Sequence, residues 1–161
     1  MSKPILVLGA GGHAAVIVDM LQQLHCNIVG LVEKDPTGSH SVFEGLTRYL
    51  SDEDILTFDK DSVILANGIG SLPGQNARFE IHKKFKSLGY SFMTLVSPLA
   101  VISAHAVLSE GVQVLPGAII NANSKIGEGT IINSGAIVEH DCNIGRYNHV
   151  APGAVLCGNV K

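Results

Sequence analysis

A histidine followed directly by an aspartate, His140 and Asp141, is the pair in this sequence best suited to acid–base chemistry. A carboxylate beside an imidazole fixes the tautomer of the ring and stabilises its protonated form, so the ring can accept a proton during a reaction. An isolated surface histidine would most often be inert, but the acidic neighbour makes a functional role the better interpretation. The pair therefore predicts proton transfer at His140.

One aliphatic position returns every six residues through the region that contains this pair. The column consists of Ile102, Leu108, Val114, Ile120, Ile126, Ile132, Val138, Ile144, Val150 and Leu156. Four residues after each of these comes a second position, which is small or modest in size. A strict period of six fits neither an amphipathic helix nor a plain strand, and it is typical of a β-solenoid, in which short strands are joined at regular corners.

Each hexad is expected to form one side of a three-sided coil, so residues 102–161 form about three coils of eighteen residues. Both columns should face inward and the residues that flank the aliphatic position outward, because side chains alternate along a strand. His140 then lies at a corner, with Ala122 and Gly158 one coil away on either side, which leaves room for a ligand. The same corner carries a polar column of His105, Asn123, Asp141 and Asn159, which could orient the carboxylate.

His149 is a second candidate, but it follows His140 by half a coil. The two rings therefore project from nearly opposite sides of the prism and cannot share a site within one chain. Several aliphatic residues are expected to point outward and to need cover, namely Ile119, Ile131, Ile137 and Val155. We predict that the prism assembles as a homotrimer around a threefold axis, which brings His149 of one subunit toward His140 of the next.

The N-terminal segment has the pattern of a strand over residues 5–8, a glycine turn and a helix that continues to residue 24. Gly11, Gly12 and His13 stand at the helix start, where backbone N–H groups can face an anion such as a nucleotide phosphate. Ala14 replaces the third glycine of the dinucleotide-binding fingerprint, so a turn that only packs a helix on a sheet remains an alternative. His13 could equally cap the helix or face solvent.

Acidic residues follow the second apolar strand, residues 28–32. Glu33 and Asp35 lie about twenty residues beyond the glycine turn, where Rossmann-type domains recognise a ribose. The segment from residue 5 to residue 35 is therefore predicted to be a β-α-β unit.

A second glycine loop follows the next apolar strand, residues 63–66. Asn67 and Gly68 begin this loop, at the edge of the sheet where open α/β folds place their ligands. A helix is predicted over residues 77–88, with Arg78 in its first turn. A cation there opposes the helix dipole, which indicates that another group needs it.

The predicted fold class is α/β plus all-β, with a small Rossmann-like domain over residues 1–97 and a parallel β-helix over residues 98–161. Residues 92–95 are expected to be a fourth strand of the first domain, and Pro98 marks the boundary because proline interrupts regular structure. The hexad register is unbroken at Lys161, from which we expect further coils beyond this residue and an incomplete β-helix here.

The charge and cysteine content exclude several classes of protein. Fourteen acidic and 11 basic residues give a formal charge of −3, which disfavours nucleic acid and membrane partners. The apolar run over residues 4–8 is too short for a signal core or a spanning helix, so a cytoplasmic location is expected. Three cysteines without CxxC spacing predict reduced thiols. The sequence contains no compact cluster of His and Cys with the spacing of metal ligands, so no metal site is expected.

Four segments together resemble the NeuD/PglD-type sugar O- and N-acetyltransferases. They are residues 9–14 (GAGGHA), 97–98 (SP), 138–145 (VEHDCNIG) and 149–154 (HVAPGA), and the similarity covers essentially the whole chain. The resemblance implies a Rossmann-like domain that binds a nucleotide-sugar, expected to be UDP-linked, and a left-handed β-helix trimer that binds acetyl-coenzyme A between subunits.

The resemblance also implies a role for each matching residue. His140 would be the general base, Asp141 its orienting acid and His149 a contact to acetyl-coenzyme A. The nucleotide-sugar site would include Gly11, Gly12, His13, Glu33, Asp35, Asn67 and Gly68. The implied activity is direct acetyl transfer to a nucleotide-linked 4-amino-sugar. An O-acetyltransferase acting on sialic acid or a related sugar, and a non-catalytic module for nucleotide-sugar binding or trimerisation, remain alternatives.

Overall fold

The computed structural model describes residues 3–33 and 40–161, and the chain divides into two compact units. The first unit is Met1–Phe92 and the second is Met93–Lys161. This division precedes the boundary expected at Pro98, because strand β5 (Leu95–Val96) pairs with strand β8 (Gln113–Val114) of the second unit. Asp35, one of the residues predicted to contact the nucleotide-sugar, lies outside the described residues.

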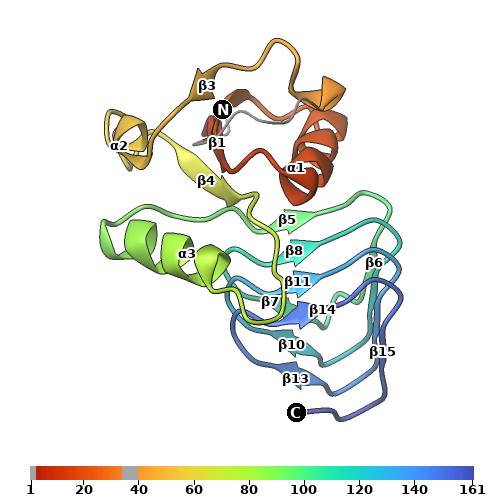
Figure 1. The fold of residues 1–161 in the computed structure, drawn as a ribbon. Helices are drawn as coiled ribbons and strands as arrows, with labels where there is room; N and C mark the ends of the chain where they lie inside the picture. The colour runs from red at the N-terminus through yellow and green to blue at the C-terminus, as the bar shows by residue number, and fades with distance from the viewer. Residues whose placement is uncertain (1–2, 34–39) are drawn as a thin grey trace. The chain divides into compact units, whose positions relative to one another are not determined.

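The first unit contains a parallel sheet of four strands in the order β3-β2-β1-β4. Figure 1 labels β1, β3 and β4 of this sheet. Its strands are β1 (Ile5–Leu8), β2 (Ile28–Val32), β3 (Arg48–Tyr49) and β4 (Ile64–Asn67). All four residues of β1 are buried, as expected for a central strand that is covered on both faces. The carboxyl ends of β1 and β4 are neighbours, because Leu8 pairs with Asn67.

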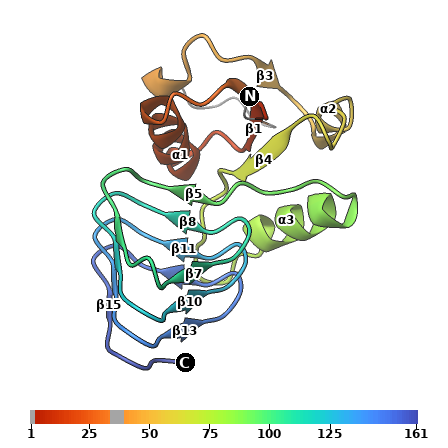
Figure 2. The same ribbon diagram turned by 180° about the vertical axis from the view of Figure 1, so that it is seen from behind.

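In the described residues, helical segments lie between these strands in the chain and after the last of them (Figure 2). They are α1 (Gly12–Gln23), the 3-10 turn η1 (Ser41–Phe43), α2 (Asp52–Ile55) and α3 (Ala77–Ser87). Helix α1 joins β1 to the parallel strand β2, which confirms the predicted β-α-β unit. Alternate residues of β1, Leu6 and Leu8, pack in a core cluster with Ile55 of α2 and Phe85 of α3.

The prediction of a strand over residues 92–95 is wrong. Phe92 makes only an isolated parallel bridge to Leu65, while Leu95 belongs to β5 of the second unit. The remaining strand of the first sheet is β3, which pairs with β2. A strand of two residues has no measurable period, so its pairing with Leu31 and Val32 could not be predicted from the pattern.

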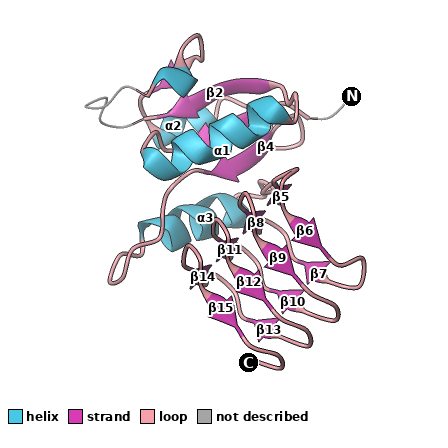
Figure 3. Ribbon diagram, turned by 90° about the vertical axis from the view of Figure 1, so that its right-hand side faces the viewer, coloured by secondary structure: helices cyan, strands magenta, loops and turns pink. Residues whose placement is uncertain are grey.

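The second unit is a three-sided parallel β-helix built of two-residue strands (Figure 3). After β5 these strands are β6 (Val101–Ile102), β7 (Val107–Leu108), β8 (Gln113–Val114), β9 (Ile119–Ile120), β10 (Lys125–Ile126), β11 (Ile131–Ile132), β12 (Ile137–Val138), β13 (Asn143–Ile144), β14 (His149–Val150) and β15 (Val155–Leu156). The first side is β5-β8-β11-β14, the second is β6-β9-β12-β15, and the third is β7-β10-β13.

The register of these sheets confirms the predicted coil of eighteen residues. Lys125 pairs with Asn143, and Ile126 pairs with Ile144, which in each case is eighteen positions later. The two predicted inward columns supply the hydrophobic core, whose buried members are Val112, Val114, Ala118, Ile120, Ile126, Ile132, Ala136, Val138, Cys142, Ile144 and Val150. The aliphatic period therefore correctly predicts the length of the coil and the side chains of each coil that face inward.

The corners of the coil require residues with positive φ. Asn123, Asp141 and Asn159 stack in one corner column at φ values of 62°, 61° and 64°. Asparagine and aspartate enter this region more readily than other residues with a Cβ atom. Tyr147 adopts a φ of 56° at another corner, in the slot held one coil earlier by Gly129, and its bulk makes this conformation unusual.

Outward aliphatic residues gather on the second side of the β-helix. Val101 and Val155 have exposed fractions of 64% and 58%, and Ile119 and Ile137 between them are half-buried. The four residues are consecutive partners in one ladder. Ile131, which was also expected to point outward and to need cover, is buried.

Candidate functional site

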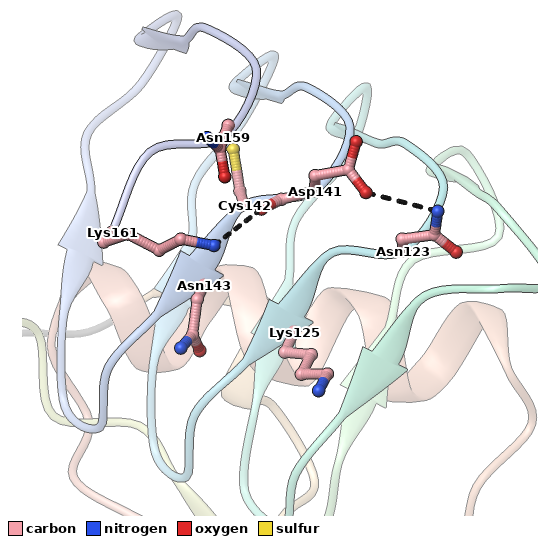
Figure 4. Close-up of a pocket in the computed structure, with 7 residues that line it drawn as sticks. All are labelled: Asn123, Lys125, Asp141, Cys142, Asn143, Asn159 and Lys161. Atoms are coloured by element: carbon pink, nitrogen blue, oxygen red, sulfur yellow. Dashed lines mark hydrogen bonds between the residues drawn. The ribbon is translucent and has the colours of Figure 1, made fainter.

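His140 and Asp141 lie together at the corner between β12 and β13, and their side chains are 63% and 50% exposed. The His140 Nδ1 atom is 2.7 Å from Asp141 Oδ2. The other carboxylate oxygen, Oδ1, accepts a hydrogen bond of 3.2 Å from Asn123 Nδ2 on the preceding coil (Figure 4). One oxygen therefore orients the imidazole while the other is anchored to the neighbouring coil, as the polar column predicted.

The electrostatics of this corner keep the carboxylate ionised. The pKa of Asp141 is lowered, first by its hydrogen bond to His140 and then by its hydrogen bond to Asn123. The charges of His140 and Lys161 act in the same direction. An ionised carboxylate accepts the Nδ1 proton of a neutral imidazole, which leaves the lone pair on Nε2 to take a proton. The geometry therefore suits His140 to the role of a base.

Gly158 determines where the His140 ring can lie. A Cβ atom on Gly158 would be 2.8 Å from both Cε1 and Nε2 of the imidazole, which is closer than such atoms approach in proteins. The space that the sequence predicted on this side of His140 is therefore filled by the ring itself. The position of Nε2 depends on the absence of a side chain at residue 158.

An open groove of about 610 Å³ lies beside this pair, on the third side of the β-helix (Figure 4). It is lined by Asn123, Lys125, Asp141, Cys142, Asn143, Asn159 and Lys161. The Lys161 ammonium donates a hydrogen bond of 3.3 Å to the backbone carbonyl of Asp141. Two cations and several amides make this groove suitable for a polar, anionic group.

The sequence pattern did not single out the lysines of this groove. Lys125 and Lys161 stand two coils apart at the same outward position, with Asn143 between them. A search for polar residues repeated at the coil spacing would have found them, because residues separated by one coil stack directly on a parallel sheet.

His149 lies on β14, on the first side of the β-helix, so it is separate from the corner that carries His140. The Nδ2 atom of Asn133 is 2.8 Å from the Nε2 atom of His149. The Asn133 Oδ1 atom accepts a hydrogen bond from the Ser134 backbone, which turns the NH₂ group toward the histidine. Nε2 of His149 is therefore an acceptor, and a neutral ring carries its proton on Nδ1.

In the first unit the two glycine loops lie against each other. The backbone N–H of Gly68 donates to the carbonyl of Leu8, and a Cβ atom on Gly68 would be 2.8 Å from Ala14 Cβ. A Cβ atom on Gly70 would similarly lie 3.6 Å from the Cβ of His13. The structure thus brings the segment that holds His13 and the loop that begins at Asn67 to one edge of the sheet.

The N-terminus of α1 has the features of an anion site. Gly11 is its N-cap and provides no side-chain hydrogen bond, and the first turn contains no acidic residue. Among residues 3–33 and 40–161, no atom would lie within 4 Å of a Cβ atom on Gly11 or Gly12, so these residues leave the space in front of the turn open. Backbone N–H groups at such a helix start are available to a phosphate.

Two of the residues predicted to bind the nucleotide-sugar are engaged within the protein. Glu33 is buried and forms an ion pair with Arg48 of β3, a partner that the sequence did not indicate. The Asn67 side chain is also buried and bonds to the backbone of Arg78 and Ile69. Both side chains therefore stabilise the structure at this edge of the sheet, in addition to any contact with a ligand.

Residues 3–33 and 40–161 contain neither a candidate metal cluster nor a candidate membrane-spanning helix. Within these ranges no group of three or more His, Cys, Asp or Glu side chains could hold a metal ion. No helix in the same ranges is long and apolar enough to cross a membrane.

Family models match both units of the chain. The model of the PglD N-terminal domain matches residues 4–84, and the bacterial transferase hexapeptide model (six repeats) matches residues 123–158. No curated protein sequence matches the chain.

Solved structures cover nearly the whole chain. A GDP-perosamine N-acetyltransferase from Caulobacter crescentus, in complex with CoA and GDP-perosamine, is 31% identical with a TM-score of 0.84, over 98% of this chain and 73% of that one. That structure and a second one carry a replacement of one histidine, by alanine and by asparagine. The acetyltransferase domain of PglB from Neisseria gonorrhoeae, in complex with acetyl coenzyme A, is 27% identical with a TM-score of 0.84, over 99% and 75%.

These matches identify the parallel coil as a left-handed β-helix, which follows an N-terminal parallel α/β domain. They also confirm the resemblance inferred from the motifs of the sequence. The chain belongs to the PglD-type hexapeptide-repeat sugar N-acetyltransferases, and it is a sugar acetyltransferase.

Proposed function

We propose that this chain transfers the acetyl group of acetyl-coenzyme A to the amino group of a nucleotide-linked 4-amino-sugar, with His140 as the general base. The observation that carries the proposal is the contact of 2.7 Å between His140 and Asp141 at an exposed corner beside a polar groove. Two kinds of relative support it, one in complex with CoA and GDP-perosamine and one in complex with acetyl coenzyme A. The histidine replacements made in the Caulobacter enzyme also support a catalytic histidine.

The proposed reaction is a direct transfer. The neutral amine of the sugar attacks the thioester carbonyl, and Nε2 of His140 takes the proton that the amine loses. The C–S bond then breaks, the acetyl group stays on nitrogen as an amide, and the thiolate receives the proton. Although Cys142 lines the groove, the residue is 1% exposed and its thiol donates a hydrogen bond of 3.2 Å to the carbonyl of Cys157, so it does not offer a nucleophile for an acyl-enzyme.

The nucleotide-sugar is proposed to bind at the edge of the first unit, where α1 begins and the loop from Asn67 follows β4. The open space in front of Gly11 and Gly12 supports binding of a diphosphate there. The family resemblance implies a UDP-linked sugar, whereas the Caulobacter relative is in complex with a GDP-linked one. The acceptor assay should therefore include both nucleotides.

The function can be tested by combining a binding measurement with an acceptor assay. We expect saturable calorimetric binding of acetyl-coenzyme A, and release of free thiol when GDP- or UDP-linked 4-amino-sugars are added. The product should carry one N-linked acetyl group by mass spectrometry. Turnover only with hydroxyl acceptors such as sialic acid would show an O-acetyltransferase, and absence of acetyl-coenzyme A binding would show a non-catalytic module.

We also propose that the active form is a homotrimer in which His149 of one subunit approaches His140 of the next. The exposed ladder from Val101 to Val155 supports this assembly, because an apolar stripe on a folded surface is favourable only when it is covered. Sedimentation equilibrium should then give three times the chain mass of 16.9 kDa. Val155→Glu should dissociate the assembly, whereas Lys125→Glu on the third side should not, and a wild-type monomer would contradict the proposal.

A further inference from the structure

Arg78 is a buried cation in the first turn of α3, and its exposed fraction is 6%. Burial lowers the pKa of its guanidinium to about 10. The N-terminus of a helix carries a partial positive charge, so a cation in this position is unfavourable unless other groups compensate it. A residue held there against both effects needs specific partners.

These partners are backbone carbonyls at the end of β4 and in the loop that follows it. Arg78 Nη1 donates to the carbonyl of Asn67 at 2.9 Å and to the carbonyl of Ile69 at 2.8 Å. The Asn67 side chain returns a hydrogen bond of 3.1 Å from Nδ2 to the Arg78 carbonyl. Its Oδ1 atom accepts the N–H of Ile69 at 3.1 Å. Arg78 and Asn67 together therefore clamp residues 67–69 from the inside of the unit.

The clamped loop forms one wall of the open space in front of α1. Its Gly68 donates to the carbonyl of Leu8, and a Cβ atom on Gly9 would lie 3.3 Å from the Ile69 side chain. These close contacts leave the loop little room to move. A shift of the loop would therefore also change the surface that a ligand at the helix start contacts. The position of this wall therefore depends on Arg78.

The clamp also matters for an anionic ligand. Carbonyl oxygens that face a phosphate repel it, and Arg78 ties two of them inward. The positive charge of the guanidinium behind the loop is weakly screened because it is buried, so it adds a favourable potential for an anion at the edge of the sheet. Both effects favour binding of a nucleoside diphosphate.

We propose that Arg78 is a positioning residue for the nucleotide-sugar: it holds the loop from Asn67 in the conformation that accepts the diphosphate, without touching the acetyl donor. This inference rests on the proposed function. It assigns a role to the cation whose place in the helix the sequence could not explain.

Arg78→Met and Arg78→Lys test the proposal, because methionine removes the charge and the donors while lysine keeps the charge. We expect Arg78→Met to raise the KM for the nucleotide-sugar about 10- to 100-fold, with the KM for acetyl-coenzyme A within about twofold of the wild type. Arg78→Lys should recover part of the loss. The dissociation constants of GDP and UDP, measured by calorimetry, should change in parallel with that KM.

Lys84→Met is the matched control, since Lys84 lies on the same helix and forms a partly buried ion pair of 2.9 Å with Asp52, away from the loop. It should lower the melting temperature and leave both KM values unchanged. A folded Arg78→Met variant that binds GDP and UDP as the wild type does would overturn the role of Arg78. Should Arg78→Met fail to fold, Arg78→Lys decides by the same criterion. A wild-type protein that binds neither nucleotide would refute the nucleotide site itself, and this inference with it.

Discussion

Replacing His140 with alanine is expected to lower kcat by about 10²- to 10⁴-fold, which is the usual contribution of a general base. The physical reason is that Nε2 then no longer takes the proton from the attacking amine. The KM values should change little, because the ring contributes to the transition state more than to binding of either substrate. Steady-state kinetics of thiol release at saturating acetyl-coenzyme A measure the effect.

The protein should tolerate this replacement without loss of structure. The His140 side chain is 63% exposed, so alanine leaves no cavity in the core and the melting temperature should stay within about 1–2 °C. His105→Ala is the matched control, because His105 is an exposed histidine at an equivalent corner two coils before Asp141, and the member of this column that donates to the Asp141 carboxylate is Asn123. Unchanged turnover in His140→Ala would refute the proposed mechanism, and a comparable loss in His105→Ala would show that the effect is not specific.

Gly158→Ala is expected to lower kcat by about 10²-fold although residue 158 carries no chemistry. The added Cβ atom would lie 2.8 Å from Cε1 and Nε2 of His140, so the ring must move away from its present position. A displacement of about 1 Å of a catalytic group is enough for a loss of this size. Neither KM should change by more than about threefold, because the groove lining does not include residue 158.

Gly145→Ala provides the matched control for this replacement. Its Cβ atom would meet the flexible side-chain amide of Asn148 at 3.2 Å, and neither Gly145 nor Gly158 has a positive φ. Both alanine variants should therefore have similar stability in urea, and only Gly158→Ala should lose turnover. If the two variants lost turnover equally, a general distortion of the coil would be the cause, and the proposed position of the ring would be wrong.

The β-helix could be predicted in detail because the same six-residue pattern recurs in every coil. The column from Ile102 to Leu156 specifies which side chains face inward, and the corner residues Asn123 and Asp141 follow from the same count. The contact between Asp141 and Asn123 was predictable for this reason, since parallel coils place residues one period apart in contact.

The first unit was less predictable because its important contacts join segments that share no period. Strand β3 has two residues, so nothing in the sequence indicates that Arg48 pairs with Glu33. The bonds from Arg78 to the carbonyls of residues 67 and 69 depend on how α3 returns to the sheet edge. The helix dipole argument indicated that Arg78 has a partner, but it could not identify that partner as backbone.

The regular stacking of the coils also restricts how this part of the gene can change in length. Each coil binds the next through backbone pairs such as Lys125 with Asn143, and alternate side chains face opposite ways. An insertion of one residue would turn every later core side chain outward, whereas a loss or gain of eighteen residues would keep all columns in place. Divergence here should therefore proceed by substitution or by whole coils, whereas loops of the first unit other than the one that begins at Asn67 can vary more readily in length.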